Sequence, residues 1–454
     1  MRLLSIDIGS TWTKGATFVL SSRNDLRVVK RAARPTTVDD LSRGFNAVYD
    51  ALSADGKPDQ IFYSSSAKGG LAIAAIGIVP DLTAEMAKLT AYSAGAKITH
   101  SFAYALSTAD IAALGNSNSD IILLAGGADG GNTHYPVENA RKLAKANLAA
   151  TIVFAGNRAV RDEVERILDG RDLVCVENVL PDLENPNPEP ARTAIRELFL
   201  KRITTGKGLD RIVTSTGKEP WPTPYALFEY CRYIAEFAPE FGEFVMVDMG
   251  GATTDVYSVH EEKNLAGTVR RGLPEAKVKR TVEGDLGMRV SARSAAVAAR
   301  KLDTSESLGA DPAFSSFVDR VSRAPETLAS NPEERRFDGV LASANLVQSV
   351  ARHSGRAHEV CTAEGLVTVQ VGRDLTEVPQ IIGTGGYLSA TANFRPRDSL
   401  SSLGTDEYGK RVLAPLRARY LRDPEYLLPL LANVAAAHPA AAVRAGLEAL
   451  VENH

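Results

Sequence analysis

Two stretches of this sequence repeat one pattern at widely separated places. Residues 6–18 read IDIGSTWTKGATF, and residues 247–259 read VDMGGATTDVYSV. Each stretch has an aspartate at the end of an apolar run, a glycine two residues later, threonine-rich polar residues and a second apolar run. One strand-end Asp-x-Gly is usually only a turn. Two copies in matching strand context predict a duplicated folding unit, which constrains the fold more than any other feature of the chain.

The first copy contains the residues of an anion-binding loop. Gly9 allows a sharp turn and a close approach to a ligand because it lacks a Cβ atom. Successive N–H groups of residues 9–12 can then point into one concavity, and Lys14 can reach phosphate oxygens from the next strand. Asp7 suits this place only if a divalent cation or its waters lie between carboxylate and phosphate. Hydroxyl donors come from Ser10, Thr11 and Thr13.

The second copy supplies the same kinds of group. Two such loops that face each other would hold a triphosphate from both sides, with metal-bound waters between the two aspartates. The residues of the second copy are Asp248, Gly250, Gly251, Thr253 and Thr254.

A glycine-rich turn follows a third apolar strand. Residues 378–390 read VPQIIGTGGYLSA, which is a strand, the turn Gly383-Thr384-Gly385-Gly386 and the start of a helix. Paired glycines let the backbone approach a flat adenine and ribose, although alone the turn could equally serve no ligand. Residues 64–66, followed by Lys68, end a strand that would face the same cleft, and we assign Ser66 to the phosphate-binding residues.

Two further polar segments leave alternatives open. Residues 126–131 (GGADGG) are a rival second phosphate loop, but a helix rather than a strand follows them. Glu283 and Asp285 lie in a polar turn before a helix, where helix capping explains them as well as a place beside a nucleotide does. The chain has no GxxxxGK[ST] P-loop and no evident sugar-binding constellation, which weakens the interpretation as a small-molecule kinase.

The order of the predicted elements indicates an α/β fold with several parts. Strands at 3–8, 15–20, 26–32 and 60–64, with a helix over 40–53, match the opening of an RNase H-like unit. Strands at 120–125, 151–155 and 173–177, each followed by a helix, predict a doubly wound, Rossmann-like insertion. The predicted domains are a first RNase H-like half (1–95), the inserted Rossmann-like domain with its connecting segment (96–242), a second RNase H-like half (243–404) and a helical C-terminal tail (405–454).

Composition restricts the setting and the partners. The net charge of −3 gives no footprint for nucleic acid or for an anionic membrane. No stretch approaches the roughly 20 apolar residues of a membrane helix. The three cysteines lack the spacing of a disulfide framework or a metal site, so we expect a reduced, cytoplasmic setting.

The order of the three motifs resembles the phosphate-1, phosphate-2 and adenosine motifs of the actin/hexokinase/heat-shock-chaperone ATPase superfamily. The resemblance implies an ATPase with ATP and Mg²⁺ as cofactors. Asp7 and Asp248 would position magnesium and the attacking water, and Lys14 would complete the catalytic set. Residues 9–11, 14 and 250–254 would hold phosphates, and residues 383–386 would hold the nucleoside.

Further segments resemble a narrower family, the accessory proteins of methylaspartate (glutamate) mutase, which also carry the name MutL without any tie to mismatch repair. These segments include SSSAKGGL (64–71), DIILLAGGADGGN (120–132) and RTVEGDLGMR (280–289). The family resembles reactivating chaperones of adenosylcobalamin-dependent mutases. It implies a chain that uses ATP to open an inactivated mutase and release its damaged cofactor.

The chain has no cobalamin-binding Asp-x-His-x-x-Gly, so it is expected to act on the cofactor's enzyme rather than to carry the cofactor. Three alternatives stay open: a carbohydrate-type kinase, a relative of hydantoinase-like amidohydrolases, and a filament or scaffold. The oligomeric state is open as well.

Overall fold

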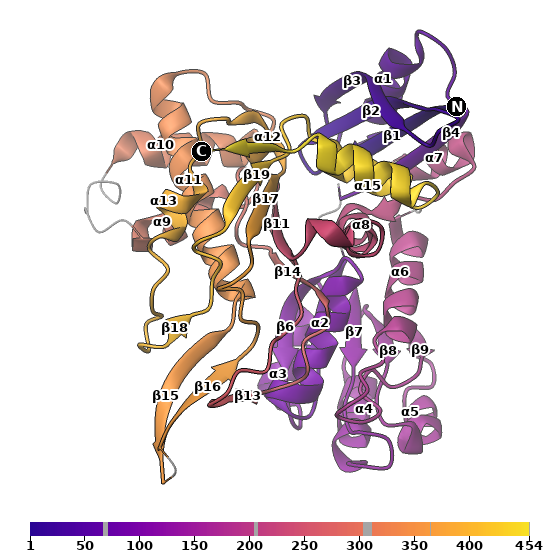
Figure 1. Cartoon of the computed structure of the whole chain (residues 1–454). Helices are drawn as coiled ribbons and strands as arrows, with labels where there is room; N and C mark the ends of the chain where they lie inside the picture. Colours follow the sequence, from indigo (N-terminus) through magenta and orange to yellow (C-terminus); the bar gives the residue numbers. More distant parts are fainter. Residues whose placement is uncertain (67–70, 204–207, 303–310, 364, 454) are drawn as a thin grey trace. The chain divides into compact units, whose positions relative to one another are not determined.

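The computed structural model describes residues 1–66, 71–203, 208–302, 311–363 and 365–453 (Figure 1). It is a mixed α/β protein with four β-sheets and two compact units. The first unit comprises residues 1–69, 204–271 and 275–454, and the second comprises 70–203 and 272–274. Within the described residues, none of the helices combines the length and the apolar character that a membrane span requires.

The first sheet of the first unit has the strand order β10-β4-β1-β2-β3. β1 is buried along nearly its whole length, as expected of a central strand with both faces covered. Helix α1 (Leu41–Ser53), whose N-terminus is capped by the Asp40 side chain, packs against β1, β2 and β3. The strands are β1 (Arg2–Ile8), β2 (Trp12–Leu20), β3 (Leu26–Pro35), β4 (Gln60–Ser65) and β10 (Trp221–Pro222).

The second sheet of the same unit has the order β14-β12-β11-β17-β19-β20. Its strands are β11 (Phe244–Met249), β12 (Thr254–Val259), β14 (Val278–Glu283), β17 (Gln380–Thr384), β19 (Arg419–Arg422) and β20 (Val451–Asn453).

The two sheets share one topology. In each, a central strand pairs antiparallel with the next strand in sequence, which pairs antiparallel with a third. On its other side the central strand pairs in parallel with a fourth strand, and this one pairs in parallel with a fifth. The central strands β1 and β11 carry the two copies of the repeated pattern. The predicted duplication is therefore confirmed in strand order and strand sense.

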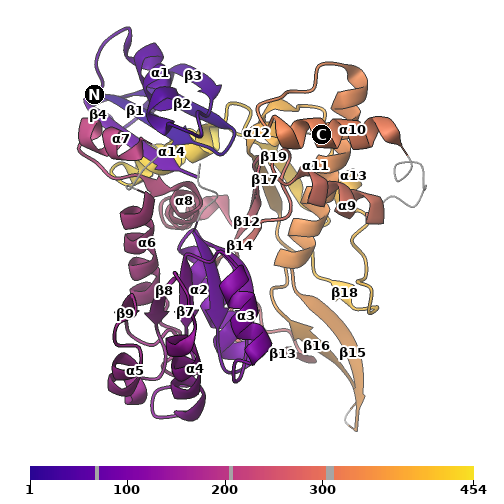
Figure 2. The same cartoon turned by 180° about the vertical axis from the view of Figure 1, so that it is seen from behind.

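Helices bury both faces of the second sheet. One core contains α8 (Thr223–Phe237), α14 (Leu427–Ala435) and α15 (Pro439–Glu448) with residues of both sheets, such as Phe18 and Tyr257. The other core contains α9 (Ala292–Leu302), α10 (Pro312–Arg323) and α11 (Pro332–His353), which gather on one side of the second sheet (Figure 2). Since α8 and α14 share a core with both sheets, they hold the two halves of the unit together.

The second unit is a five-stranded sheet with all strands parallel and the order β6-β5-β7-β8-β9. The three parallel strands predicted from the sequence are β7, β8 and β9. The elements in chain order are β5 (Ala72–Ile76), α2 (Glu85–Ser93), β6 (Lys97–Phe102), α3 (Thr108–Asn116), β7 (Ile121–Leu124), α4 (His134–Lys145), β8 (Thr151–Phe154), α5 (Arg161–Ile167), β9 (Leu173–Cys175) and α6 (Glu189–Ile203).

The boundaries of the units differ from the predicted domain boundaries. The second unit begins at residue 70 rather than 96, because the apolar run of β5 pairs with β6 and β7. It ends at residue 203, apart from residues 272–274. The segment after it returns to the first unit, where α7 (Leu209–Thr216) contacts α1 and β10 pairs with β4.

The predicted helical tail, 405–454, is only partly helical. β19 pairs in parallel with β17 and extends the second sheet, and β20 pairs with β19. The fourth sheet, β13-β16-β15-β18, also belongs to the first unit. The remaining elements are β13 (Thr268–Arg271), β15 (Arg356–Thr362), β16 (Gly365–Val371), β18 (Arg411–Val412), α12 (Gly386–Ala390), α13 (Pro396–Leu400) and the short turns Pro80–Ala84, Arg158–Val160 and Pro239–Phe241.

Candidate functional site

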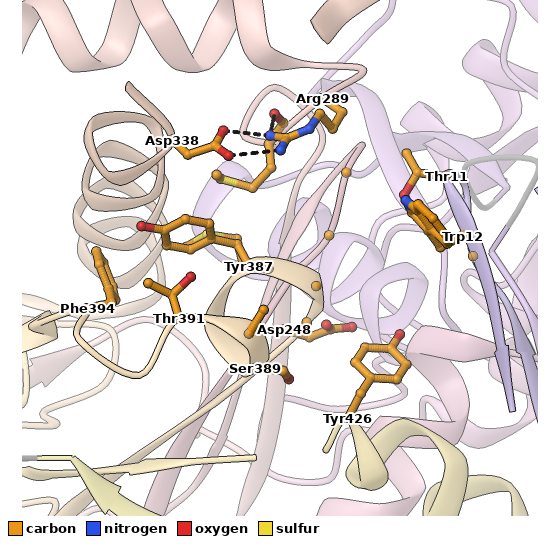
Figure 3. A pocket seen from close by; sticks show the side chains of 18 of the residues that line it. Thr11, Trp12, Asp248, Arg289, Asp338, Tyr387, Ser389, Thr391, Phe394 and Tyr426 are labelled. Carbon is orange, nitrogen blue, oxygen red and sulfur yellow. Dashed lines mark hydrogen bonds and ion pairs between the residues drawn. The ribbon is translucent and has the colours of Figure 1, made fainter. Parts of the chain in front are cut away.

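A cavity of about 1590 Å³ opens in the first unit where the repeated loops lie (Figure 3). Both copies of the pattern and the glycine-rich turn contribute to its lining. The predicted site residues that line it are Asp7, Gly9, Ser10, Thr11, Lys14, Ser66, Asp248, Gly250, Gly251, Thr253, Gly385 and Gly386. Segments that are distant in sequence therefore meet at one place, as the duplicated pattern predicts.

Asp7 is fixed by three hydroxyl groups. Its Oδ1 accepts hydrogen bonds from Ser64 Oγ at 3.0 Å and from Thr223 Oγ1 at 2.6 Å. Its Oδ2 accepts one from the Tyr426 hydroxyl at 2.9 Å. Ser64 lies opposite Asp7 on the parallel neighbour β4, so the sheet register itself delivers the first of these donors. The carboxylate is held in one orientation at the edge of the cavity.

Lys14 is the cross-strand partner of Asp7 in the β1–β2 ladder. Its ammonium lies over the ring of Tyr426, with Nζ 3.3 Å from the ring centroid. Burial lowers the pKa of Lys14, while the charges of Asp7, Asp248 and Asp423 oppose that shift. Lys14 therefore supplies positive charge within a group of acids.

Asp248 has a different environment. Its cross-strand partner is Asp255, and burial together with the charges of Asp255 and Asp7 raises the pKa of Asp248 to about 7. Asp255 itself is held by Thr253 and by a buried ion pair in which Arg280 Nε donates to Asp255 Oδ1 at 2.9 Å. Two carboxylates that face each other in a buried place disfavour ionisation of the less well paired one.

The second loop is braced from behind by residues 284–291. The N–H groups of Met288 and Arg289 donate to the carbonyls of Gly250 and Gly251 at 3.1 and 2.8 Å. The hydroxyl of Ser291 donates to the carbonyl of Ala252 at 2.7 Å. These bonds point three successive carbonyls of the loop toward residues 284–291. The segment RTVEGDLGMR thus has a structural task at the site.

Close backbone packing explains two of the glycines. A Cβ atom on Gly251 would lie 2.5 Å from Thr11 Cγ2, so any side chain at this residue would force Thr11 or the loop to move. Gly385 has φ +100°, and a Cβ atom there would lie 2.3 Å from the carbonyl oxygen of Met249. The glycine-rich turn therefore packs directly on the end of β11.

The outer part of the cavity is lined by side chains from α11, α12 and the segment after α12. Arg289 forms a two-point ion pair with Asp338 at 2.8 and 3.0 Å. Tyr387 and Phe394 meet edge to face with ring centroids 5.6 Å apart, and both line the cavity together with Ser389 and Thr391 (Figure 3). Aromatic faces and polar groups of this kind suit a flat heterocycle with hydrogen-bonding edges.

Four predicted binding residues do not line the cavity. Their side chains or backbone serve the surrounding structure instead; for Thr13 and Thr254 the reason is that neighbouring residues of a strand point to opposite faces. Thr13 pairs with the Thr36 hydroxyl, Thr254 donates to the carbonyl of Leu286, and Thr384 donates to Asp423. Gly383 lies within β17, opposite Val247.

The segments left open by the sequence lie elsewhere. Residues 126–131 belong to the second unit. Glu283 and Asp285 both pair with Arg352 and do not line the cavity. Lys68 lies outside the described residues.

Sequence reasoning missed three residues that touch the loops: Thr223, Tyr426 and Asp423. Asp423 accepts hydrogen bonds from the N–H groups of Leu427 and Leu428 at 2.8 and 3.0 Å and so caps α14. The signal in the sequence was an Asp-Pro pair just before a leucine-rich helical run, a common helix start. The contact of Tyr426 with Asp7 had no local signal.

The donor set fits a divalent cation together with phosphate. Lys14 is surrounded by Asp7, Asp248 and Asp423, so the site carries more negative than positive charge. Among the described residues, no group of three or more His, Cys, Asp or Glu side chains is arranged to hold a metal ion. Magnesium would therefore complete its shell with water and phosphate oxygens, which it prefers.

Fold and site together define a mixed α/β protein with four sheets, in which two sheets of one topology carry the acid-and-glycine loops that line the cavity. The family model described as MutL protein matches residues 3–449. Protein MutL of Clostridium tetanomorphum is 37% identical over 458 residues, which cover 97% of each chain. The chain belongs to the MutL protein family.

Solved structures show weaker overall similarity. The nucleotide-free structure of acetone carboxylase, from work on ATP-dependent acetone carboxylation, has a TM-score of 0.42 at 12% identity and covers 96% of this chain and 70% of that one. A solved structure of a glycerol dehydratase reactivase has a TM-score of 0.35 at 10% sequence identity. The match covers 96% of this chain and 100% of that one. The activator of 2-hydroxyisocaproyl-CoA dehydratase from Clostridium difficile, with bound ADPNP, has a TM-score of 0.31 at 10% sequence identity. The match covers 99% of this chain and 98% of that one. The family assignment rests on the sequence similarity.

Proposed function

We propose that this protein binds ATP with magnesium in the cavity of its first unit and hydrolyses it slowly. The observation that carries the proposal is that three separate sequence motifs line one cavity. The two loops supply backbone N–H groups and hydroxyls for phosphates, Lys14 supplies a cation, and the turn at Gly385 adjoins a lining suited to a nucleoside.

The strand order supports the finer assignment of the fold. Two sheets, each with three antiparallel strands followed by two parallel ones, have the arrangement of the RNase H-like halves of actin-like ATPases. The order of the second unit, 2-1-3-4-5 in its own numbering, is that of a doubly wound domain and agrees with a Rossmann-like insertion.

The chain's own residues would divide the work of hydrolysis. Asp7, held by Ser64, Thr223 and Tyr426, is placed to orient metal-bound water. Asp248 has a pKa of about 7, so its carboxylate could accept a hydrogen bond or a proton from a water beside the phosphates. Lys14 would balance phosphate charge. Magnesium, when bound, would supply Lewis-acid stabilisation of that charge.

The biological role we propose is that of a reactivating factor for an adenosylcobalamin-dependent mutase of the glutamate type. Membership of the MutL family and the sequence resemblance described above support it. The physical basis is that a ligand gripped by both halves favours their closed arrangement, and a bound partner can respond to that difference. The nucleotide would then bias the opening of the mutase.

Phosphate release from purified protein tests the ATPase proposal. Wild type should release phosphate from Mg²⁺-ATP without any acceptor, and Asp7→Ala and Asp248→Ala should each reduce the rate at least about 100-fold. Asp50→Ala, at an exposed position, is the matched control and should keep the wild-type rate. Turnover that depends on an added sugar or polyol would favour the kinase, and the absence of nucleotide binding would end the proposal.

The partner proposal needs its own experiment. Purified glutamate-type mutase loaded with hydroxocobalamin should release the inert cofactor only with this protein and hydrolysable ATP together. Asp248→Ala should not support release. Equal release by that variant would overturn the role in reactivation while leaving ATP binding untouched. Filaments seen by electron microscopy with ATP would favour a scaffold instead.

A further inference from the structure

Arg289 contacts the second loop with its backbone and the outer wall of the cavity with its side chain. Its N–H donates to the carbonyl of Gly251 at 2.8 Å, and the N–H of Val290 donates to the same carbonyl at 2.8 Å. The guanidinium forms the two-point ion pair with Asp338 on α11 (Figure 3), and Nε donates to the carbonyl of Thr327 at 2.9 Å. One residue therefore joins the loop to α11 and to the segment before α11.

The ion pair is buried and has a defined geometry. Arg289 is 8% exposed and Asp338 is 5% exposed. Burial raises the pKa of Asp338, while the hydrogen bonds and the charge of Arg289 oppose that shift. A planar guanidinium donates to both carboxylate oxygens at once, whereas an ammonium acts as a point charge. The pair therefore fixes the direction of α11 relative to residue 289 as well as its distance.

The aromatic wall of the cavity lies beside Asp338. The next residue on α11 is Gly339, and a Cβ atom there would lie 3.5 Å from the hydroxyl of Tyr387. Burial raises the pKa of Tyr387 to about 12, with a further contribution from the charge of Asp338 that the charge of Arg289 opposes. The ring that adjoins the glycine-rich turn is therefore seated on α11 next to the ion pair.

The other end of the connection adjoins the first loop. Gly251 lies so close to Thr11 that a Cβ atom on the glycine would be 2.5 Å from Thr11 Cγ2. A shift of the second loop by a few tenths of an ångström would therefore alter its contact with the first loop, where the phosphates are proposed to bind. The backbone at residue 289 restrains that shift, because it holds the carbonyl of Gly251.

We propose that Arg289 is a positioning residue for ATP hydrolysis, whose ion pair with Asp338 sets the second loop relative to the wall that receives the nucleoside. This inference rests on the proposed function and deepens it. A nucleoside that packs against Tyr387 restrains α11, and the ion pair extends that restraint to the loop backbone at Gly251. Binding energy from the nucleoside then contributes to the orientation of the phosphates, and so to kcat, rather than to affinity alone.

Phosphate release from Mg²⁺-ATP and from Mg²⁺-tripolyphosphate tests this role, because tripolyphosphate has the phosphates without the nucleoside. Wild type should have a kcat with ATP at least about 10-fold above that with tripolyphosphate. Arg289→Lys keeps the charge and the backbone hydrogen bonds but loses the fork that reaches Asp338 and Thr327. It should lower kcat with ATP about 10-fold and leave kcat with tripolyphosphate within about 2-fold of wild type.

Arg352→Lys is the matched control. Arg352 pairs with Glu283 and Asp285, which belong to the segment that leads to Arg289, but it does not line the cavity. The substitution again exchanges a guanidinium fork for an ammonium. Neither rate should change in this variant.

Two further measurements separate the positioning role from a loss of folding. Thermal unfolding shows whether each variant is folded at the assay temperature. If Arg289→Lys is not, the double variant Arg289→Met/Asp338→Leu removes both buried charges together and should show the same selective loss with ATP. In a Tyr387→Leu background, Arg289→Lys should no longer lower kcat with ATP, because the wall through which it acts is gone.

The outcomes distinguish this role from simpler ones. Equal losses with ATP and tripolyphosphate would show that Arg289 only supports the loop, and an unchanged kcat with ATP, whatever the KM, would show no effect on positioning. Either result would overturn the inference, as would a wild-type kcat that is the same for both substrates, while the proposed hydrolysis of ATP would stand. Wild type that neither binds nor hydrolyses ATP would overturn the proposed function, and the positioning role with it.

Discussion

The two repeated loops share a template but differ at the position opposite their aspartates. In the first sheet Asp7 faces Lys14 across the ladder, and in the second Asp248 faces Asp255. Opposite charges stabilise such cross-strand pairs, and like charges destabilise them. In the second sheet Arg280 compensates for the like charges, because its buried guanidinium pairs with Asp255. The same fold element thus holds a balanced pair in one half and an acidic pair with a separate counter-ion in the other.

This difference divides the chemistry between the halves. Asp7 is fixed by three hydroxyl donors and serves as an anchor, whereas Asp248 is crowded by acids and its pKa is raised to about 7. The two loops share a backbone arrangement, but burial and then the cross-strand charge of Asp255 raise the pKa of the second aspartate. Substitutions can therefore be directed at one half at a time.

The largest loss of stability is expected when Arg280 is replaced. Arg280→Leu leaves Asp255 buried without its guanidinium partner and opposite Asp248, and it should lower the free energy of unfolding by about 3–5 kcal/mol. Chemical denaturation of the two proteins measures the difference. The double variant Arg280→Leu/Asp255→Leu should regain most of the loss, since it removes both charges. A double variant as unstable as the single one would contradict the ion-pair account.

Replacing each aspartate by alanine should change the free energy of unfolding differently for Asp7 and for Asp248. Asp7→Ala leaves three hydroxyl groups without this acceptor, two of them buried, and should cost about 2–4 kcal/mol. Asp248→Ala relieves repulsion from Asp255 and Asp7, so its free energy of unfolding at pH 8 should be equal to or higher than that of wild type. Denaturant titration of both variants at one pH decides this, and equal losses would show that the loops are energetically alike.

We expect the second sheet to contain a contact whose contribution to folding stability is lost at acid pH. Its Ser258 bonds the buried His353, whereas the corresponding Thr17 of the first sheet bonds the carbonyl of Leu52. Burial, followed by the charges of Lys279 and Arg373, lowers the pKa of His353 well below its ordinary value. The unfolded chain therefore binds a proton at this imidazole that the folded chain does not, and the contribution of His353 to stability should fall as pH drops below about 6.5, by up to about 1.4 kcal/mol per pH unit.

Thermal or denaturant unfolding of wild type and His353→Gln from pH 8 to pH 5 tests that contribution. The variant should be less stable at pH 8, and its difference from wild type should shrink toward pH 5, because the raised pKa of Asp248 affects both proteins alike. Parallel curves would mean that His353 does not carry the effect.

The smallest effects concern two hydroxyls at the same register. Ser64 faces Asp7 and donates to it, whereas Thr384 faces Asp248 but donates to Asp423. Ser64→Ala and Thr384→Val should each cost about 1 kcal/mol of unfolding free energy. In the Asp7→Ala background the Ser64 effect should shrink to the part due to its hydrogen bond from Asn433, but in the Asp248→Ala background the Thr384 effect should persist in full. Equilibrium unfolding of the six variants measures both cycles.

The duplicated loops could be predicted because their information is local. Asp7 to Lys14 and Asp248 to Thr253 identify strand ends, tight turns and donors within a few residues of sequence. The parallel strands β7, β8 and β9 were likewise evident as apolar runs followed by helices. Each of these runs is identified by its own hydrophobic pattern, without information from distant residues.

Contacts set by long-range register could not be predicted. Thr223 and Tyr426 reach Asp7 from other parts of the chain, and only the packing of α8 and α14 brings them there. Thr13 and Thr254 belong to predicted motifs, but strand alternation points them away from the cavity. The start of the second unit was missed because the apolar run of β5 could have paired with either sheet.

The most direct test of the account is a crystal structure of the protein with a non-hydrolysable ATP analogue and magnesium. The account predicts phosphates between residues 9–14 and 250–253, magnesium on the side of Asp7 and Asp248, and the base against Tyr387. The segment 126–131 of the second unit was the rival phosphate loop in the sequence. Nucleotide bound there, with the cavity between the repeated loops lacking phosphate, would contradict the central claim.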